Sequence, residues 1–263
     1  MAEITAQAVK ALRDATGAGM MDAKKALVEA DGDRDRAVQL LREKGLTKVA
    51  TLEDRENNQG AVAIARSGNT AAIVHLKSET DFSAKAADFV ALTQKLADVV
   101  LADGVEAVST LADEIDTLKI TKKENIELGT VARFEAAAGN TLDAYLHIQD
   151  GRGTNGVLVE IDGADDDQTH EISLHIAFAK PTALSRDEID PELVAKATAS
   201  FEELTRKEGK PEQAIPKIVE GRVGSWFGER VLPEQGLFGD KETVQAKLGS
   251  ATIVRFAQAV IGN

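Results

Sequence analysis

Residues 60–76 read GAVAIARSGNTAAIVHL, and this stretch decides the fold class of the chain. Small and apolar residues alternate on both sides of Ser67-Gly68-Asn69, a pattern typical of two antiparallel strands joined by a tight turn. An acidic loop, SETDFSAK at 78–85, comes next. It is followed by a segment with helical spacing through Phe89, Leu92, Leu96 and Val99. The predicted order is therefore strand, strand, acidic loop, helix.

The same order occurs a second time further along the chain. TLDAYLHIQDGRGTNGVLVEI at 141–161 predicts another strand pair, and DGADDDQ at 162–168 predicts another acidic loop. The helix that follows runs through Ile172, His175, Ile176 and Ala179 and ends at Pro181. NIELGTVARFEA at 125–136 and TIVRFAQAV at 252–260 each predict one more strand. This repetition indicates a diverged duplication, so we expect an α+β fold whose core has two halves with related antiparallel sheets.

Helices are predicted on both flanks of this core. Residues 4–46 predict three short helices, with N-caps at Thr5 and Asp33 and with Gly45 at the C′ position of the third. The predicted core positions of this bundle are Val9, Leu12, Met20, Ala23, Ala26, Leu27, Ala37, Leu40 and Leu41. We therefore expect a small helical bundle that can present a helix face.

A helical hairpin is predicted at 187–230. Its first helix is expected to be lined by Ile189, Leu193, Ala197 and Leu204, and its second by Ile215, Ile218, Val219 and Phe227. EGKPE at 208–212 predicts the turn between them. Because most of the remaining surface is charged, the hairpin is expected to project from the core.

The expected organisation follows from these elements. Residues 1–50 form the helical bundle, and the polar, aperiodic residues 51–59 form a linker. Residues 60–140 form the N-terminal half of the core. Residues 141–263 form the C-terminal half, including the hairpin at 187–230.

Composition narrows the possible functions. With 263 residues and 43% hydrophobic composition, the chain can bury a core of two or three modules. The sequence has no cysteine, no basic leader followed by an apolar stretch, and no apolar run near the ~20 residues that span a bilayer. We expect a cytoplasmic protein without a membrane partner. The formal charge of -13 opposes direct binding to nucleic acid, although residues 1–50 hold nine basic against eight acidic residues.

The sequence patterns also argue against an enzyme. Gly17-x-Gly19 follows a helix rather than a strand, and no P-loop motif occurs. His170 and His175 are five residues apart, whereas a zinc helix needs four to place both imidazoles on one face. The chain has four His and no Cys, and no arrangement of a nucleophilic triad. We therefore expect no catalytic residue, no metal site and no cofactor.

One loop stands out from this background. Asp81 is followed at once by Phe82, in a chain with only 8 Phe, 1 Tyr and 1 Trp. The corresponding loop at 162–168 has no aromatic residue, so the fold does not require one there. Two interpretations are open. Asp81 caps the following helix while Phe82 folds back on the sheet, or the loop presents Phe82 as an anchor for a pocket on a partner.

Three segments resemble the characteristic motifs of the elongation factor Ts family: TGAGMMDAKKAL at 16–27, SETDFSAK at 78–85 and GKPEQAIPKIVEGR at 209–222. Their order and spacing fit that family along essentially the whole chain. The resemblance implies that the bundle is UBA-like (of ubiquitin-associated type). It also implies that bundle and core together bind elongation factor Tu, a GTPase, in its GDP-bound and nucleotide-free forms, and release GDP without covalent chemistry.

The resemblance further implies which residues act. The magnesium-dislodging loop, which enters the GTPase domain near its magnesium site, corresponds to Thr80, Asp81, Phe82 and Ser83. The family usually has Val where Ser83 stands. The GTPase domain is also expected to meet Met20, Met21 and Lys24, and the partner's third domain is expected to touch His147. The alternative is an adaptor that binds proteins through a UBA-like bundle and oligomerises through its core.

Overall fold

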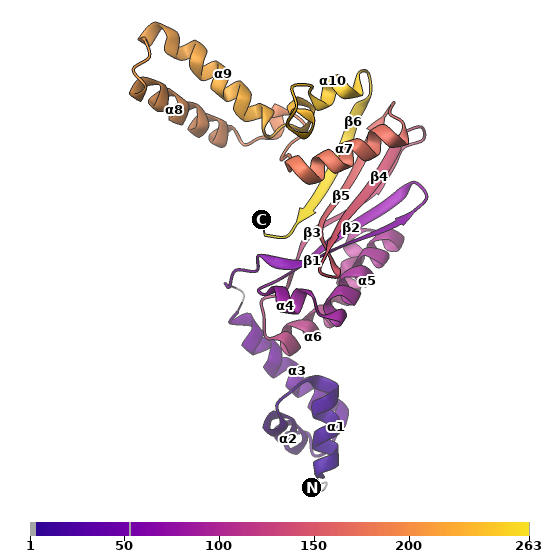
Figure 1. Cartoon of the computed structure of the whole chain (residues 1–263). Coiled ribbons are helices and arrows are strands. Elements are labelled where there is room, and N and C mark those ends of the chain that lie inside the picture. The colour runs from indigo at the N-terminus through magenta and orange to yellow at the C-terminus, as the bar shows by residue number, and fades with distance from the viewer. Residues whose placement is uncertain (1–3, 53, 263) are drawn as a thin grey trace.

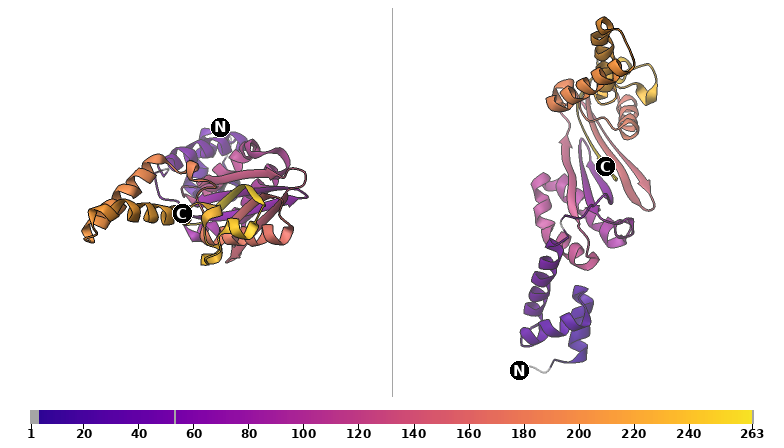
Figure 2. Two further views of the ribbon diagram at one scale, coloured as in Figure 1. Left: turned by 90° about the horizontal axis from the view of Figure 1, so that it is seen from above. Right: turned by 90° about the vertical axis from the view of Figure 1, so that its left-hand side faces the viewer.

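The computed structural model describes residues 4–52 and 54–262, with a sheet in the middle of the molecule and helices at both ends (Figures 1 and 2). The N-terminal helices lie at one end of this elongated shape, and a helical hairpin lies at the other. Within the described residues, each strand of the sheet runs antiparallel to the strands it pairs with. The α+β class is therefore confirmed.

Three helices form the N-terminal end: α1 Ala6–Thr16, α2 Met20–Glu29 and α3 Arg34–Ala50. Thr5 caps α1, because its hydroxyl oxygen accepts a hydrogen bond from the Ala8 N–H at 3.2 Å. Asp33 caps α3 in the same way by accepting from the backbone of Asp35 and Arg36. The helices pack on a small cluster of their own, which includes Val9, Leu12, Ala23, Ala26, Leu27, Ala37 and Leu41.

The prediction that Gly45 ends the third helix is wrong, since α3 continues to Ala50. The glycine instead allows α3 to approach α6 (Ala112–Lys122), because a Cβ at Gly45 would lie 2.8 Å from Cγ1 of Ile120. Arg42 also forms an ion pair with Asp113 at this contact. The bundle is thus attached to the core through α3 and α6.

The core contains six strands: β1 Gln59–Ser67, β2 Thr70–Ser78, β3 Glu127–Glu135, β4 Thr141–Gln149, β5 Arg152–Asp162 and β6 Thr252–Val260. In the first half β2 pairs with both β1 and β3, and in the second half β5 pairs with both β4 and β6. Each half adds a long helix, α5 (Ala87–Asp103) or α7 (Asp166–Ala179). The predicted repeat of strand, strand, loop and helix is confirmed.

The related sheets expected for the two halves are joined, because their strands form one six-stranded sheet. The junction between β1 and β5 is a single pair of residues, Val62 and Gly153. A Cβ at Gly153 would lie 2.1 Å from the carbonyl oxygen of Val62, so this approach requires glycine. The sequence signals of each half are local and do not report this contact.

The helices lie outside and the two sets of strands pack against each other. Phe89 and Leu96 of α5 are buried against β1 and β2, and Ile172 and Ile176 of α7 are buried against β4 and β5. A further buried cluster between the halves draws on all six strands and includes Val62, Ile73, Phe134, Leu142, Leu158 and Ala259. Both halves therefore share one core region.

The sequence patterns did not predict several short elements. α4 (Asp81–Ala84) precedes α5, and a 3-10 helix, η1 (Val105–Leu111), leads into α6. The remaining short elements are η2 (Arg186–Glu188), η3 (Glu212–Ala214), η4 (Leu232–Glu234), η5 (Leu237–Gly239) and α10 (Val244–Leu248). Of these, α4 matters most, because it carries Phe82.

The hairpin of α8 (Pro191–Lys207) and α9 (Ile215–Gly228) extends away from the sheet (Figure 1). Of the seam predicted for the first helix, Ile189 is buried and Ala197 is half-buried, but the prediction is wrong for Leu193 and Leu204, which are 54% and 48% exposed. Thr205 is buried instead, and half-buried Val194 and Phe201 lie on the same side of α8. Two sets of residues, one position apart, fit the helical period in this segment. The hairpin buries the set with Val194, Phe201 and Thr205, and not the set with Leu193 and Leu204.

Candidate partner-binding surface

The loop at 78–85 is closed by a cap at Thr80. The Thr80 hydroxyl oxygen accepts a hydrogen bond from the Ser83 N–H at 3.2 Å and begins the short helix α4. The interpretation that Asp81 provides the cap is therefore wrong. Asp81 is instead the first residue of α4, where its negative charge is favourable near the positive end of the helix dipole.

Phe82 points to solvent, with 85% of its surface exposed. The next two residues of α4 face inward, since Ser83 is 3% and Ala84 0% exposed. Phe82 therefore does not fold back on the sheet. A large apolar side chain exposed to this degree gains free energy when a partner covers it.

Glu124 braces the loop from the segment that follows α6. Its carboxylate accepts hydrogen bonds from the Thr80 N–H at 3.2 Å, from the Thr80 hydroxyl at 2.7 Å and from the Ser83 hydroxyl at 2.6 Å. Lys123 adopts a positive φ of 58° where α6 ends, and Glu124 follows directly. Ser83 lies in the predicted contact loop, but its buried side chain supports the loop from inside.

The second half of the core holds the other side of α4. The Arg152 Nη1 donates a hydrogen bond to the carbonyl oxygen of Asp81 at 3.0 Å. The Lys85 ammonium lies 2.8 Å from the Asp81 carboxylate and 3.1 Å from that of Asp150. The hydrogen bond from Lys85 lowers the pKa of the Asp81 carboxyl below its usual value, and the Arg152 charge adds to this effect. Asp81 therefore stays ionised beside Phe82.

The last residues of β4, just before its turn into β5, add two exposed side chains. His147 is exposed near the end of β4, and Ile148 is 64% exposed. The register of β4 on β5 shifts between these two residues, as at a β-bulge. The Tyr145 hydroxyl lies 3.3 Å from Nδ1 of His147. The predicted residue His147 thus lies on β4, three residues before Asp150, whose carboxylate pairs with Lys85 of the loop.

The predicted bundle residues form a separate surface on α2. Met20 and Met21 are 45% and 64% exposed, and Lys24 is also exposed. The expectation that Met20 packs in the bundle is wrong. Ala23 and Ala26 are small and let this side of α2 approach its neighbours closely, which leaves both methionines at the start of the helix outside.

Sequence reasoning missed the residues that brace the loop. Glu124 contacts Thr80 across 44 positions of the chain, and Arg152 contacts Asp81 across 71. Lys85 lies in the loop itself, four residues after Asp81, and its distant partner is Asp150. Local sequence patterns do not predict the contacts of Glu124, Asp150 and Arg152, because these residues come from distant segments.

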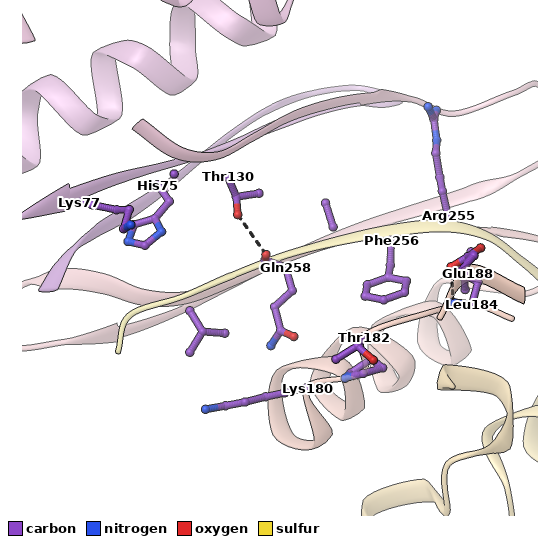
Figure 3. A pocket seen from close by; sticks show the side chains of 14 residues that line it. His75, Lys77, Thr130, Lys180, Thr182, Leu184, Glu188, Arg255, Phe256 and Gln258 are labelled. Atoms are coloured by element: carbon purple, nitrogen blue, oxygen red, sulfur yellow. Dashed lines mark hydrogen bonds between the residues drawn. The ribbon is translucent and has the colours of Figure 1, made fainter. Parts of the chain in front are cut away.

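A hollow on the described surface lies away from this loop, and Figure 3 shows it from close by. Its volume is about 750 Å³, and β6 crosses it with Phe256 and Gln258. Within it the Thr130 hydroxyl lies 3.5 Å from the Gln258 carbonyl oxygen, and Lys77 and Lys180 also line it. Across residues 4–52 and 54–262, no group of three or more His, Cys, Asp or Glu residues could hold a metal ion.

Among the helices that the structure describes, none combines the length and the apolar character needed to cross a bilayer. The fold and the surface around Phe82 together define an α+β protein with an exposed aromatic side chain on a braced loop. This is the type of surface that proteins use to bind other proteins.

Comparison with known proteins makes the assignment specific. The family model described as Elongation factor TS matches residues 79–263. The chain belongs to the elongation factor Ts family, and hence to the elongation factors of protein biosynthesis. Family membership implies nucleotide exchange on elongation factor Tu during translation elongation, without covalent chemistry.

Curated relatives cover nearly the full chain, including the N-terminal bundle. The chain is 40% identical to elongation factor Ts of Deinococcus deserti over 97% of this chain and 99% of the relative. It is 42% identical to that of Kineococcus radiotolerans, over 94% of both chains. It is also 42% identical to that of Mycolicibacterium smegmatis, over 100% of this chain and 99% of the relative.

Proposed function

We propose that the chain is a guanine nucleotide exchange factor for elongation factor Tu, and that its Thr80–Ser83 loop promotes GDP release by entering the GTPase domain near the magnesium site. The observation that carries this proposal is Phe82, which is 85% exposed on a loop braced by two distant segments. Bracing lowers the conformational entropy lost on binding, because the loop is ordered before the partner arrives. Next to Phe82, the ionised carboxylate of Asp81 brings a negative charge toward the magnesium site of the partner.

Exchange of this kind obeys thermodynamic linkage. A factor that lowers the affinity of the GTPase for GDP must itself bind the GDP-bound form less tightly, by the same factor. Each tenfold change corresponds to about 1.4 kcal/mol, so a large effect needs an interface wider than one loop. The proposed interface therefore includes Met20, Met21 and Lys24 on α2 and His147 on β4.

The proposed division of labour follows the expected domains. Residues 1–50 act as a UBA-like module that binds the GTPase domain, and residues 51–59 act as a linker. Residues 60–140 present Phe82, while residues 141–263 present His147 and carry the hairpin. The factor acts on GDP-bound and nucleotide-free elongation factor Tu, and its proposed place of action is the cytoplasm, where translation runs.

The test is release of fluorescent GDP from purified elongation factor Tu. Phe82→Ala should slow release about thirtyfold, since truncation of an interface anchor costs ~2 kcal/mol or more. The melting temperature should hardly change, because an exposed side chain contributes well under ~1 kcal/mol to stability. Phe178→Ala is the matched control, since Phe178 is 64% exposed on α7.

Three outcomes would contradict the proposal. An unchanged rate of GDP release in Phe82→Ala would remove the loop from the mechanism. A collapse of the fold in that variant would assign Phe82 to the core. Binding of elongation factor Tu by the unaltered chain without any GDP release would favour the adaptor function instead.

A further inference from the structure

Arg152 is a buried arginine at the joint between the two halves of the core, with only 6% of its surface exposed. Its Nη1 donates to the Asp81 carbonyl oxygen at 3.0 Å, and its Nη2 donates to Oε1 of Gln59 at 3.2 Å. Its Nε is buried and has no hydrogen-bond partner among the described residues. Burying a guanidinium is costly, so its place under α4 calls for a reason other than stability.

The hydrogen bond to Asp81 is not needed to satisfy the backbone of α4. The Asp81 carbonyl oxygen already accepts from the Lys85 N–H at 3.0 Å, which closes the helical turn. A carbonyl oxygen has two lone pairs, and Arg152 uses the second one. The hydrogen bond from Arg152 is therefore not part of the helical hydrogen bonding of α4. It fixes where the helix that carries Phe82 lies relative to the second half of the core.

The neighbouring residues make this joint rigid. Gly153 pairs with Val62, where a Cβ would lie 2.1 Å from the Val62 carbonyl oxygen. Lys85 adds an ion pair with Asp150 at 3.1 Å on the turn before β5. His147 lies on the same strand pair, so its position is tied to that of Phe82 through the start of β5.

We propose that Arg152 is a positioning residue for nucleotide exchange: it holds Phe82 of the first half at a fixed place relative to His147 of the second half. The partner then meets both contacts as one preformed surface. This inference rests on the proposed function. Without Arg152 the cap, α4 and the Glu124 brace remain, and only the exposed ion pair between Lys85 and Asp150 still ties α4 to the second half. An exposed ion pair holds a side chain weakly, so part of the ordering of Phe82 must then take place while GDP leaves.

The test measures fluorescent-GDP release from elongation factor Tu as a function of the concentration of the full-length factor. Arg152→Met keeps the apolar stem and removes both donors. We expect its maximal release rate to fall five- to twentyfold, with a half-saturating concentration within twofold of the unaltered chain. Arg152→Lys should recover part of the loss, because an ammonium can donate to the Asp81 carbonyl. Arg133→Met is the matched control, since Arg133 also donates to a backbone carbonyl, that of Leu101 at 3.0 Å.

A double-mutant cycle separates positioning from general destabilisation. If Arg152 acts through Phe82, adding Arg152→Met to Phe82→Ala should slow release by less than twofold. A full five- to twentyfold further loss in the double variant would overturn the inference, as would an unchanged maximal rate in Arg152→Met. If Arg152→Met does not fold, Arg152→Lys in both backgrounds carries the same comparison. Failure of the unaltered chain to release GDP would overturn the proposed function, and the inference with it.

Discussion

The carboxylate of Glu124 accepts two hydrogen bonds from Thr80, one from the backbone N–H at 3.2 Å and one from the hydroxyl at 2.7 Å. A third, from the Ser83 hydroxyl at 2.6 Å, falls on the same oxygen as the second. Thr80 thereby serves both as the cap of α4 and as the point where the loop is tied to the segment after α6. The exposed Phe82 sits between the two residues that Glu124 holds.

Glu124→Ala should therefore loosen the loop without unfolding the core. The substitution removes the carboxylate, and with it charge-assisted hydrogen bonds that contribute about 1.5–3 kcal/mol each in favourable settings. Glu124 is half-buried, so water replaces part of these hydrogen bonds. We expect GDP release to slow about three- to tenfold and the melting temperature to fall by a few degrees. Glu106→Ala, at an exposed position of η1, is the control. Equal release rates for the two variants would contradict the bracing role.

Met21 tests the bundle surface separately from the loop. Met21→Ala should weaken binding of elongation factor Tu about three- to tenfold, because a 64% exposed methionine on α2 is available for contact. The maximal rate of GDP release should stay the same, since Phe82 and its loop are unchanged. Titration of the factor in the release assay measures both quantities. Val28→Ala, 55% exposed on the same helix, should leave both unchanged. An equal effect of the two variants would count against a specific surface.

The hairpin should tolerate shortening. Its base packs in a small cluster of Ala183, Ile189, Phe227 and Val231, which is separate from the cluster under α7. Removing two helical turns from both α8 and α9, next to the turn at 208–214, should lower the melting temperature by only a few degrees, because the removed residues bury mainly their own seam. Thermal unfolding followed by circular dichroism measures this. A fall of more than about ten degrees would mean that the tip supports the core.

His75 predicts how stability depends on pH. Its ring lies between Gly60 and Gly129, is 7% exposed, and has no partner for Nε2 among the described residues. Burial, with a smaller effect of Lys77, lowers the pKa of His75 to about 4. The unfolded chain, with a histidine pKa near ~6.5, therefore binds more protons between these values. Stability must fall as the pH drops from about 6.5 toward 4, by about 3 kcal/mol at most for this group.

The measurement is urea unfolding at pH 7.5 and pH 4.5 for the unaltered chain and for His75→Leu. Carboxylates titrate in both proteins, so the difference between them isolates the histidine. We expect that difference to shift by roughly 2–3 kcal/mol in favour of the leucine variant at the lower pH. His147→Leu, at an exposed position, should show a much smaller shift. A difference that does not change with pH would mean that His75 is not held neutral by burial.

Local signals in the sequence predicted the local structure well. The alternation in residues 60–76 and the glycine at position 68 define β1, β2 and the turn between them, because neighbouring residues alone determine these features. The exposure of Phe82 was one of two open interpretations. The structure favours the exposed position because Thr80, and not Asp81, caps α4. The sequence analysis placed Thr80 in the contact loop and did not identify it as a helix cap.

Features that depend on distant segments were not predictable in this way. Gly45 reads equally well as a helix end or as a close-contact site, and only the position of Ile120 distinguishes them. Leu193 and Leu204 fit a helical stripe, but so do Val194 and Thr205, and packing against α9 decides between the stripes. Arg152 has no sequence signal for its role, because its partner Asp81 belongs to the other half of the core.

The unbroken course of α3 through Gly45 has a consequence for affinity. This helix, about 25 Å long at 1.5 Å per residue, carries the bundle and packs on α6 of the core. Once Phe82 has engaged a partner, α2 meets the same partner at an effective concentration that the helix sets, as with a stiff linker between two binding modules. Because the helix is stiff, this effective concentration is high only when the two binding sites on the partner have the same spacing as α2 and Phe82, and it is negligible for other spacings. One residue inserted into α3 would turn the bundle by about 100° and uncouple the two contacts, although neither surface would have changed.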